Sequence, residues 1–207
     1  MAIAIDLNVG PQGIALGDGT DVQARAGRTG ELIVTELHGR YFEQMRSNRM
    51  FSAANQAATT TSAALATGYL GLLLYNPVNS NKLLVPNKVK LALAAAPAAW
   101  SIIGLLGGFA ATGGVTAQTT PLAIQSNQIG NSSKGVGIAL ASATIVAPTV
   151  IFTLSDGITA AGIPAATLPY DLEGVFGILP GGFIGIYTQT ATSSIGAMSW
   201  EEVDLPL

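Results

Sequence analysis

The sequence contains no cysteine and only one histidine in 207 residues. Without thiols the chain cannot form disulfides or thiolate metal sites, so its stability must come from packing or assembly. Charged residues make up 10% of the chain, whereas a typical soluble domain has about 25%. So little charge covers the surface of a monomer poorly, which predicts that other subunits cover much of the outside.

The few charges are unevenly distributed along the chain. No Asp or Glu lies between Glu43 and Asp156, and all five arginines fall between Arg25 and Arg49. The net charge is −3 and the pI is about 5.0. A nucleic-acid-binding protein shows a basic patch that acidic residues do not match, so we expect no nucleic-acid partner.

The same scarcity argues against catalysis. His38 is the only histidine, and the chain has no Gly-x-Ser-x-Gly motif that would favour a serine–histidine–acid triad. A glycosidase needs two carboxylates near one sugar, and the acid-free middle supplies none. Glu201, Glu202 and Asp204 cluster near the end, but Glu201 faces away from the other two, which favours a solvated strand edge over a calcium site. We expect no enzyme activity, metal or cofactor.

Short apolar segments separated by turn residues run through most of the chain. The most regular is Gly68 to Leu93, in which Asn-Pro-Val-Asn-Ser-Asn joins two apolar runs and lysines alternate with apolar residues in the second run. We predict an antiparallel hairpin there. A second hairpin is predicted where Pro180-Gly181-Gly182 joins Leu172–Leu179 to Phe183–Thr188. Such segments, spaced by turn signals and without a long helix, are typical of an all-β sandwich.

The domain boundaries follow from these patterns. We place an extended N-terminal arm and a charged interface segment at residues 1–50, and the β-sandwich domain at residues 51–207. Residues 52–67 are small and polar, which predicts a surface connection or a thin edge strand. Residues 91–110 carry no charge and could span a bilayer. Proline and glycines interrupt that run, so buried strands are favoured and we expect no membrane association.

The polar segment from Arg25 to Arg49 has the best claim to a binding role. Its arginines and glutamates lie beside Tyr41 and Phe42, and interfaces use forked guanidinium pairs and aromatic anchors of this kind. The alternative is a solvated face. The residues that we assign to a partner interface are Arg25, Arg28, Glu31, His38, Arg40, Tyr41, Phe42 and Arg46.

Three stretches together resemble structural proteins of tailed bacteriophages. They are GRTGELIVTELHGRYFEQ at residues 27–44, LLLYNPVNSNKLLVPNKVKL at residues 72–91, and LPGGFIGIY with SWEEVDLP near the end. The resemblance is to small jelly-roll virion components such as head decoration or cement proteins. It implies a jelly-roll-like antiparallel β-sandwich, often trimeric, bound to a capsid or tail surface. It implies no catalytic residue.

We therefore expect a non-enzymatic virion structural protein, in the first place a capsid decoration or cement protein that binds and stabilises the phage head. It would act as a homo-oligomer, with a trimer favoured, on the major capsid protein or other virion proteins. The alternative is a tail spike or fibre module that binds a receptor or glycan. An exposed aromatic platform around Trp100, Tyr170 or Trp200 would favour that alternative.

Overall fold

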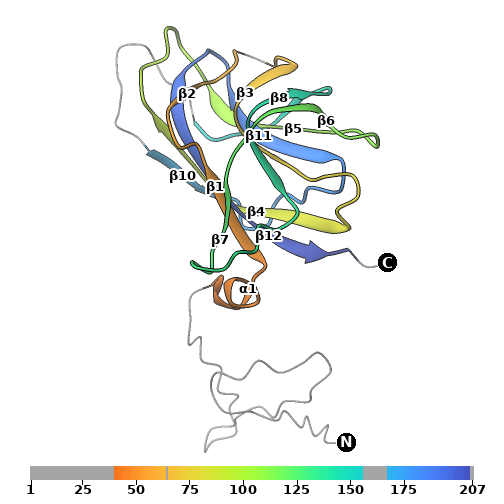
Figure 1. Ribbon diagram of the computed structural model, residues 1–207. Helices are drawn as coiled ribbons and strands as arrows, with labels where there is room; N and C mark the ends of the chain where they lie inside the picture. Colours follow the sequence, from red (N-terminus) through yellow and green to blue (C-terminus); the bar gives the residue numbers. More distant parts are fainter. Residues whose placement is uncertain (1–39, 64, 156–166, 206–207) are drawn as a thin grey trace, which may run out of the picture. The chain divides into compact units, whose positions relative to one another are not determined.

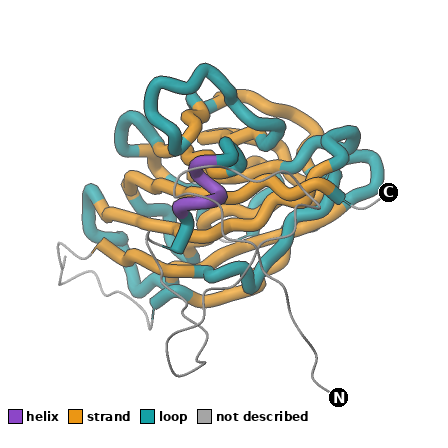
Figure 2. The backbone as a smooth tube through the Cα atoms, turned by 90° about the horizontal axis from the view of Figure 1, so that it is seen from below, coloured by secondary structure: helices purple, strands orange, loops and turns teal. Residues whose placement is uncertain are grey.

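The computed structural model describes residues 40–63, 65–155 and 167–205. The chain divides after Phe42 into two units, and the second unit, Glu43–Leu207, carries the fold. Its described residues form two antiparallel six-stranded sheets that share a core, with one short helix, α1 (Phe42–Arg46). Figure 2 shows that strands make up most of the described backbone. The predicted all-β sandwich is confirmed.

The first sheet contains β1 (Met50–Ala54), β2 (Thr59–Thr60), β4 (Lys82–Leu93), β7 (Ile124–Ser126), β10 (Thr167–Asp171) and β12 (Ser193–Asp204). Its order is β10-β4-β12-β1-β7, with β2 paired to β12 off this path. The second sheet contains β3 (Gly68–Tyr75), β5 (Ile103–Phe109), β6 (Val115–Pro121), β8 (Ile138–Ile145), β9 (Thr149–Thr153) and β11 (Gly182–Thr188). Its order is β6-β8-β3-β11-β5-β9.

Eight of these strands have the connectivity of a jelly roll (Figure 1). They pair in the orders β1-β12-β4-β10 and β3-β11-β5-β9, which is the arrangement of two Greek keys in a double sheet. The strands β6, β7 and β8 form an insertion between β5 and β9. The insertion lengthens both sheets, because β8 and β6 continue the second sheet beyond β3 and β7 continues the first beyond β1.

The apolar sequence of β3 reflects burial on both faces of the second sheet. Successive side chains of a strand point to opposite faces. Leu72 and Leu74 pack in the core between the sheets, together with the fully buried Trp200. Leu73 and Tyr75 pack in a second cluster with residues of β5, β6, β8 and β11. The pairing of β8 with each of its two neighbours contains register shifts. Such bulges increase the local twist of a sheet.

The alternation predicted in the second apolar run is confirmed in β4. Lys88 and Lys90 are exposed, whereas Val89 and Leu91 are buried. Pro86 lies where β4 and β12 shift register. Because proline cannot donate to a ladder, it is tolerated inside a sheet at such an irregularity.

The hairpin predicted over Gly68–Leu93 is wrong in its pairing. Both runs are strands, but β3 pairs with β8 and β11, and β4 pairs with β10 and β12. The Asn-Pro turn therefore carries the chain from one sheet to the other. Turn residues indicate where a strand ends, but they do not determine the partner of the next strand.

The second predicted hairpin is also wrong, because Leu172–Leu179 is not a strand. That segment consists of turns and a single bridge between Leu84 and Ile178. The segment Phe183–Thr188 does lie in β11, as predicted. The loop before β11 thus packs against the start of β4 and not alongside β11.

The strand β1 overlaps a range for which a surface connection or a thin edge strand was expected. Its last residues belong to the range 52–67, yet β1 pairs with β12 on one side and β7 on the other. Met50 and Phe51 are buried, and the Phe51 ring lies 6.3 Å from that of Trp200. Large side chains at the start of β1 therefore anchor a strand whose other side chains are small.

Residues 91–110 belong to the sandwich and contain the end of β4, a connection and β5. Among the described residues, no helix has the length and apolar character needed to cross a membrane. The predicted arm falls largely on residues 1–39, which lie outside the described residues. The division into residues 1–50 and 51–207 stays a prediction, and the first strand begins at Met50.

Candidate interaction sites

An apolar pocket of about 410 Å³ lies beside the edge strand β9, where β5, β11 and the loop before β11 meet. No charged residue lines it. Three of its large apolar side chains are exposed: Phe109 to 61%, Leu179 to 53% and Ile151 to 40%. Exposed apolar side chains grouped around one pocket are typical of an interaction site, whereas single ones are ordinary. We call this site the apolar pocket.

Glycines keep the apolar pocket open. A Cβ atom at Gly107 would lie 3.1 Å from Cδ1 of Ile151, so a side chain there would fill the floor. Gly181, in the turn before β11, has a φ of 89°, a conformation that favours glycine. Its carbonyl oxygen accepts a hydrogen bond of 2.7 Å from the N–H of Gly114. The loop that forms one wall is therefore tied to the second sheet.

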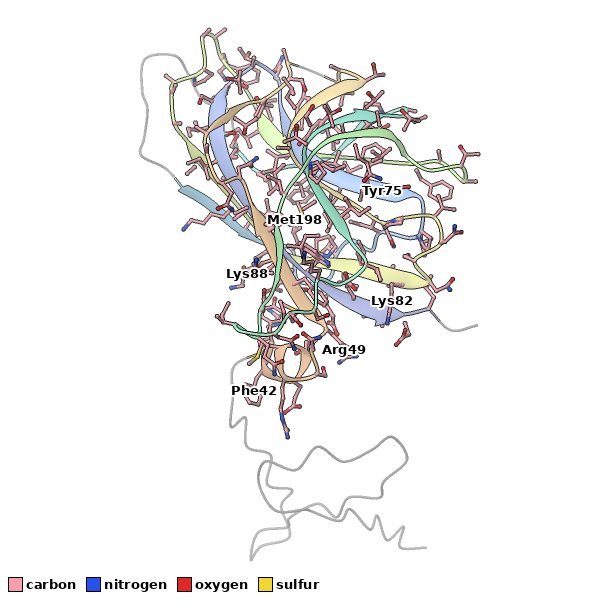
Figure 3. All side chains as sticks on the ribbon, in the orientation of Figure 1. Phe42, Arg49, Tyr75, Lys82, Lys88 and Met198 are labelled. Atoms are coloured by element: carbon pink, nitrogen blue, oxygen red, sulfur yellow. The ribbon has the colours of Figure 1, made fainter. Side chains whose placement is uncertain are left out.

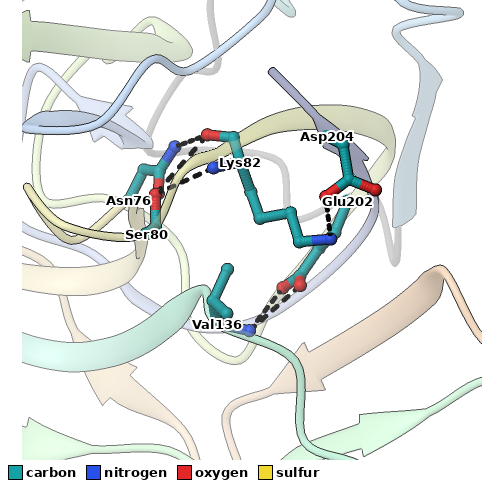
Figure 4. A network of polar contacts seen from close by, with 6 residues as sticks. All are labelled: Asn76, Ser80, Lys82, Val136, Glu202 and Asp204. Carbon is teal, nitrogen blue, oxygen red and sulfur yellow. Dashed lines mark hydrogen bonds and ion pairs between the residues drawn. The ribbon is translucent and has the colours of Figure 1, made fainter. Parts of the chain in front are cut away.

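Asn76, which is fully buried in the turn between β3 and β4, holds the same wall (Figure 4). Its side-chain amide donates to the carbonyl oxygens of Ile178 at 2.7 Å and Lys82 at 2.8 Å. Its backbone N–H donates to the carbonyl oxygen of Gly182 at 2.9 Å, and its carbonyl oxygen accepts from the N–H of Gly181 at 2.8 Å. The turn that links the two sheets therefore also positions the loop that walls the apolar pocket.

A second apolar feature, which we call the Ile129 turn, lies at Gln128–Asn131 in the insertion. Ile129 is 90% exposed. The N–H of Asn131 donates to the carbonyl oxygen of Gln128 at 2.9 Å, and the Asn131 side-chain amide donates to Oε1 of Gln128 at 2.7 Å. Gly130 supplies the φ of 96° that the turn requires. Hydrogen bonds on both sides thus hold the isoleucine out in solvent.

Glu202 anchors the end of the loop that carries the Ile129 turn (Figure 4). Its carboxylate accepts hydrogen bonds from the N–H groups of Val136 and Gly137, both at 2.9 Å, and from the Trp200 indole at 3.2 Å. Gly135 has a φ of 66°, and a Cβ atom there would overlap Oε1 of Glu202. The solvated strand edge predicted for Glu202 is wrong, because this carboxylate is buried and satisfied by backbone donors.

The outer face of the first sheet carries a polar groove of about 420 Å³, which we call the lysine groove. Lys88 and Lys90 of β4 and Gln125 of β7 line it, together with small residues of β1 and β12 and no aromatic ring. Lys88 projects from β4 in Figure 3, and its ammonium group lies 3.4 Å from Oδ1 of Asp171. The groove therefore offers hydrogen-bond donors beside alanines and Met198, which also lines it.

Half of the predicted interface residues can be placed. The other half lie outside the described residues: Arg25, Arg28, Glu31 and His38. Arg40 is exposed, and Tyr41, Phe42 and Arg46 are half-buried. The Arg40 guanidinium carbon lies 5.8 Å from the centre of the Tyr41 ring, within the range of a cation–π contact. Their role at a partner interface stays a prediction.

The other acidic side chains near the C-terminus pair with cations. Oε1 of Glu201 lies 3.4 Å from Nη2 of Arg49, and Oδ1 of Asp204 lies 2.5 Å from Nζ of Lys82. Surface pairs of this kind contribute little to stability, about 0–1 kcal/mol each. In the part of the chain that the structure describes, no three histidine or acidic side chains are grouped as metal ligands would be.

The three aromatic residues proposed for a glycan platform have different environments. Trp100 is 50% exposed, whereas Trp200 is fully buried. Tyr170 is half-buried, with its ring 5.2 Å from that of Phe152. Only Trp100 therefore offers much of its ring to a ligand.

Sequence reasoning did not identify the apolar pocket, because its walls come from segments far apart in the chain. The available signal was the pair of glycine doublets, Gly107-Gly108 and Gly181-Gly182, each next to a large apolar residue. Comparison with protein-family models, curated proteins and solved structures finds no match to this chain.

Proposed function

We propose that this chain is a non-enzymatic virion structural protein, a capsid decoration or cement protein that binds and stabilises the head of a tailed bacteriophage. It acts as a homo-oligomer, with a trimer favoured, and its partners are the major capsid protein or other virion proteins. The observation that carries the proposal is the apolar pocket, where Phe109, Ile151 and Leu179 are exposed around a lining without charge.

The physical argument is one of association by apolar burial. Burying apolar surface contributes about 25 cal/mol per Å², from which ordering and association costs are subtracted. Because only 10% of its residues are charged, this chain can bury more of its surface against other subunits than an average domain can. The phage assignment itself rests on the sequence resemblance, and a jelly roll, which viral capsid and lectin domains also use, is compatible with it.

The test uses phage heads assembled without this chain and then titrated with the purified full-length protein. We expect saturable co-sedimentation and heads that withstand a higher temperature. Phe109→Ser combined with Leu179→Ser should weaken this binding, because it disrupts the pocket through which the copies of the oligomer associate, whereas the matched control Ile195→Ser, at an exposed residue of β12 outside the pocket, should retain it. Heads that bind neither wild type nor variants would contradict the proposal.

The predicted arm has its own test in the same assay. Replacing Arg28, Arg40 and Tyr41 together with alanine should leave the sandwich folded and weaken attachment to heads, because guanidinium and aromatic groups are typical interface anchors. Circular dichroism and thermal melting establish that the variant is folded. Unchanged occupancy of the heads by the folded variant would remove the arm from the mechanism.

A second candidate function is a receptor- or glycan-binding module of a tail spike or fibre. The half-exposed ring of Trp100 favours it, since aromatic rings with one free face are available for stacking. The test is a glycan array probed with wild type and Trp100→Ala. A signal that the substitution abolishes would support this candidate over the decoration role, and an array without any signal would exclude it for the glycans present.

A further inference from the structure

The Ile129 turn is built to hold its shape before any partner arrives. Beyond the hydrogen bonds within it, the N–H of Gln128 donates to Oγ of Ser126 at 3.1 Å, and the N–H of Asn127 donates to the carbonyl oxygen of Met50 at 2.9 Å. The loop is therefore tied to β1 at its beginning, just after β7, and is fixed at its other end by the carboxylate of Glu202. A preorganised apolar tip loses little conformational freedom when it becomes buried.

The Ile129 turn and the apolar pocket lie on opposite flanks of the sandwich. The turn follows β7, which is at one edge of the first sheet, whereas β10 is near the other edge. Phe152 of β9 packs on Tyr170 of β10 with ring centroids 5.2 Å apart, and on Phe176 at 6.0 Å, which places the pocket at the β10 flank. Four strand spacings separate β7 from β10, or about 19 Å. One molecule cannot fill its own pocket with its own turn.

The two features match in chemistry and in size. The turn Gln128–Asn131 carries no charge, and neither does the lining of the apolar pocket. A charged tip would lose its hydration in such a pocket without gaining a partner. The volume of about 410 Å³ exceeds the roughly 150 Å³ in which an apolar cavity holds a benzene-sized group. It therefore has room for an isoleucine side chain and part of its turn.

We infer that Ile129 of one copy inserts into the apolar pocket of the next copy, between Phe109, Ile151 and Leu179. The inference rests on the proposed function, since it specifies the self-association that the decoration role requires. Because turn and pocket are different surfaces, the contact is heterologous and joins copies head to tail. Such a contact closes into a ring where the rotation between copies permits it.

The natural absence of cysteine allows a clean cross-linking test. Two single variants of the full chain, Ile129→Cys and Leu179→Cys, are mixed and oxidised with oxidised glutathione. A disulfide requires the two Cα atoms to come within about 7 Å. We expect a covalent dimer in the mixture and none from either variant alone. In the matched control, Ile129→Cys is mixed with Thr119→Cys and not with Leu179→Cys. Thr119 is an exposed residue of β6 outside the pocket, so this mixture should give no dimer.

Sedimentation of the unoxidised chain provides the second measurement. Ile129→Asp should weaken self-association about 10- to 100-fold or more, and Ile129→Leu should retain it, because only the aspartate must lose its hydration in the pocket. Ile129 is solvent-exposed, so both variants should fold like wild type, which their circular dichroism spectra check.

The outcomes separate the contact from the function. A dimer from Ile129→Cys alone, a cross-link equal to that of the control, or an oligomer unchanged by Ile129→Asp would each overturn the contact. If such a chain still binds phage heads, the decoration role stands with a different subunit interface. A wild-type chain that neither self-associates nor binds heads contradicts both proposals.

Discussion

At the scale of single residues, Glu202 shows how a buried charge is stabilised without a cation. Two backbone N–H groups and one indole N–H surround its carboxylate. Charge-assisted hydrogen bonds of this kind are about twice as strong as neutral ones. An amide in place of the carboxylate would turn an N–H₂ group towards backbone donors. The loop from Val136 back to the Ile129 turn therefore depends on this one side chain.

The first prediction concerns that carboxylate. Glu202→Gln should lower the free energy of unfolding by about 1–3 kcal/mol, because the three N–H donors lose a charged acceptor and the Val136 N–H loses its second contact, to Oε2 at 3.0 Å. Chemical denaturation measures the change. Glu201→Gln is the matched control, since this neighbouring side chain forms a partly exposed pair with Arg49, and it should cost less than about 1 kcal/mol. Equal effects of the two substitutions would contradict the role of Glu202.

Tyr69 provides a second residue-scale case. Its hydroxyl lies 2.7 Å from the carbonyl oxygen of Leu72 and 2.9 Å from that of Ile186. The ring fits over Gly71 and Gly185, where a Cβ atom would meet the hydroxyl. Burial raises the pKa of Tyr69 well above its ordinary value. The phenol therefore stays neutral in the folded protein at a pH where an exposed tyrosine ionises.

The second prediction follows from that raised pKa. The folded-state pKa lies above the unfolded value of about 10, so Tyr69 contributes stability below pH 10 that is lost as pH rises beyond it. Above pH 10 the unfolded chain releases this proton and the folded chain keeps it, which lowers stability by up to about 1.4 kcal/mol per pH unit. Tyr69→Phe should flatten this alkaline decline, as measured by urea unfolding between pH 8 and about pH 11.

Tyr187→Phe is the control for the tyrosine experiment. Tyr187 is half-buried in β11, so its substitution tests the general effect of removing a phenol from the second sheet. Tyr69→Phe should also lower stability at neutral pH by about 1–3 kcal/mol, since two buried carbonyl groups lose the one hydroxyl donor that they share. An alkaline decline that is as steep in Tyr69→Phe as in Tyr187→Phe would show that Tyr69 does not cause it.

At the scale of elements, periodicity and turn residues predicted the positions of several strands but not their pairing. The alternation of lysines in β4 and the apolar run of β3 were sufficient to predict two strands, because each pattern follows from which faces are buried. The hairpin between them was wrong, since Asn76-Pro77 ends a strand equally well in a hairpin and in a crossing between sheets. Side-chain patterns do not distinguish the two cases.

The candidate sites were harder to predict for a related reason. Phe109 and Leu179 are about as apolar as buried neighbours in the sequence, and only the fold determines that they are exposed together. Likewise, Ile129 lies in a polar loop rich in Asn, Ser and Gly, and one isoleucine in such a loop has no periodicity to interpret. The functional surfaces are therefore products of strand order, which a single sequence does not determine.

The third prediction is for the turn that crosses between the sheets. Asn76→Ala should lower the free energy of unfolding by about 2–4 kcal/mol, because the buried carbonyls of Ile178 and Lys82 each lose a donor. The substitution should also speed hydrogen exchange at the N–H of Ile178, which donates to the carbonyl oxygen of Leu84 at 2.8 Å. Asn79→Ala, at an exposed position of the same turn, is the control and should change stability by less than about 0.5 kcal/mol.

At the scale of the whole molecule, the scarcity of charge is the property that the proposals explain. The four lysines after Arg49 lie in an otherwise uncharged stretch, and acids outside it pair with Lys82 and Lys88. Among the described residues, four exposed large apolar side chains lie at the apolar pocket and the Ile129 turn, and others, such as Trp100 and Ile195, lie elsewhere on the surface. A jelly roll with a complementary feature on each flank can join copies without charged contacts.

The main proposal is that other copies of the chain cover the uncharged apolar pocket and Ile129 turn. Its most direct test is the mass of the purified full-length protein in solution, measured by sedimentation over a range of concentrations and at low and high salt. The account predicts a multiple of 21.0 kDa that high salt does not dissociate, because screening weakens charged contacts and leaves apolar ones intact. A mass of 21.0 kDa at every concentration would contradict it.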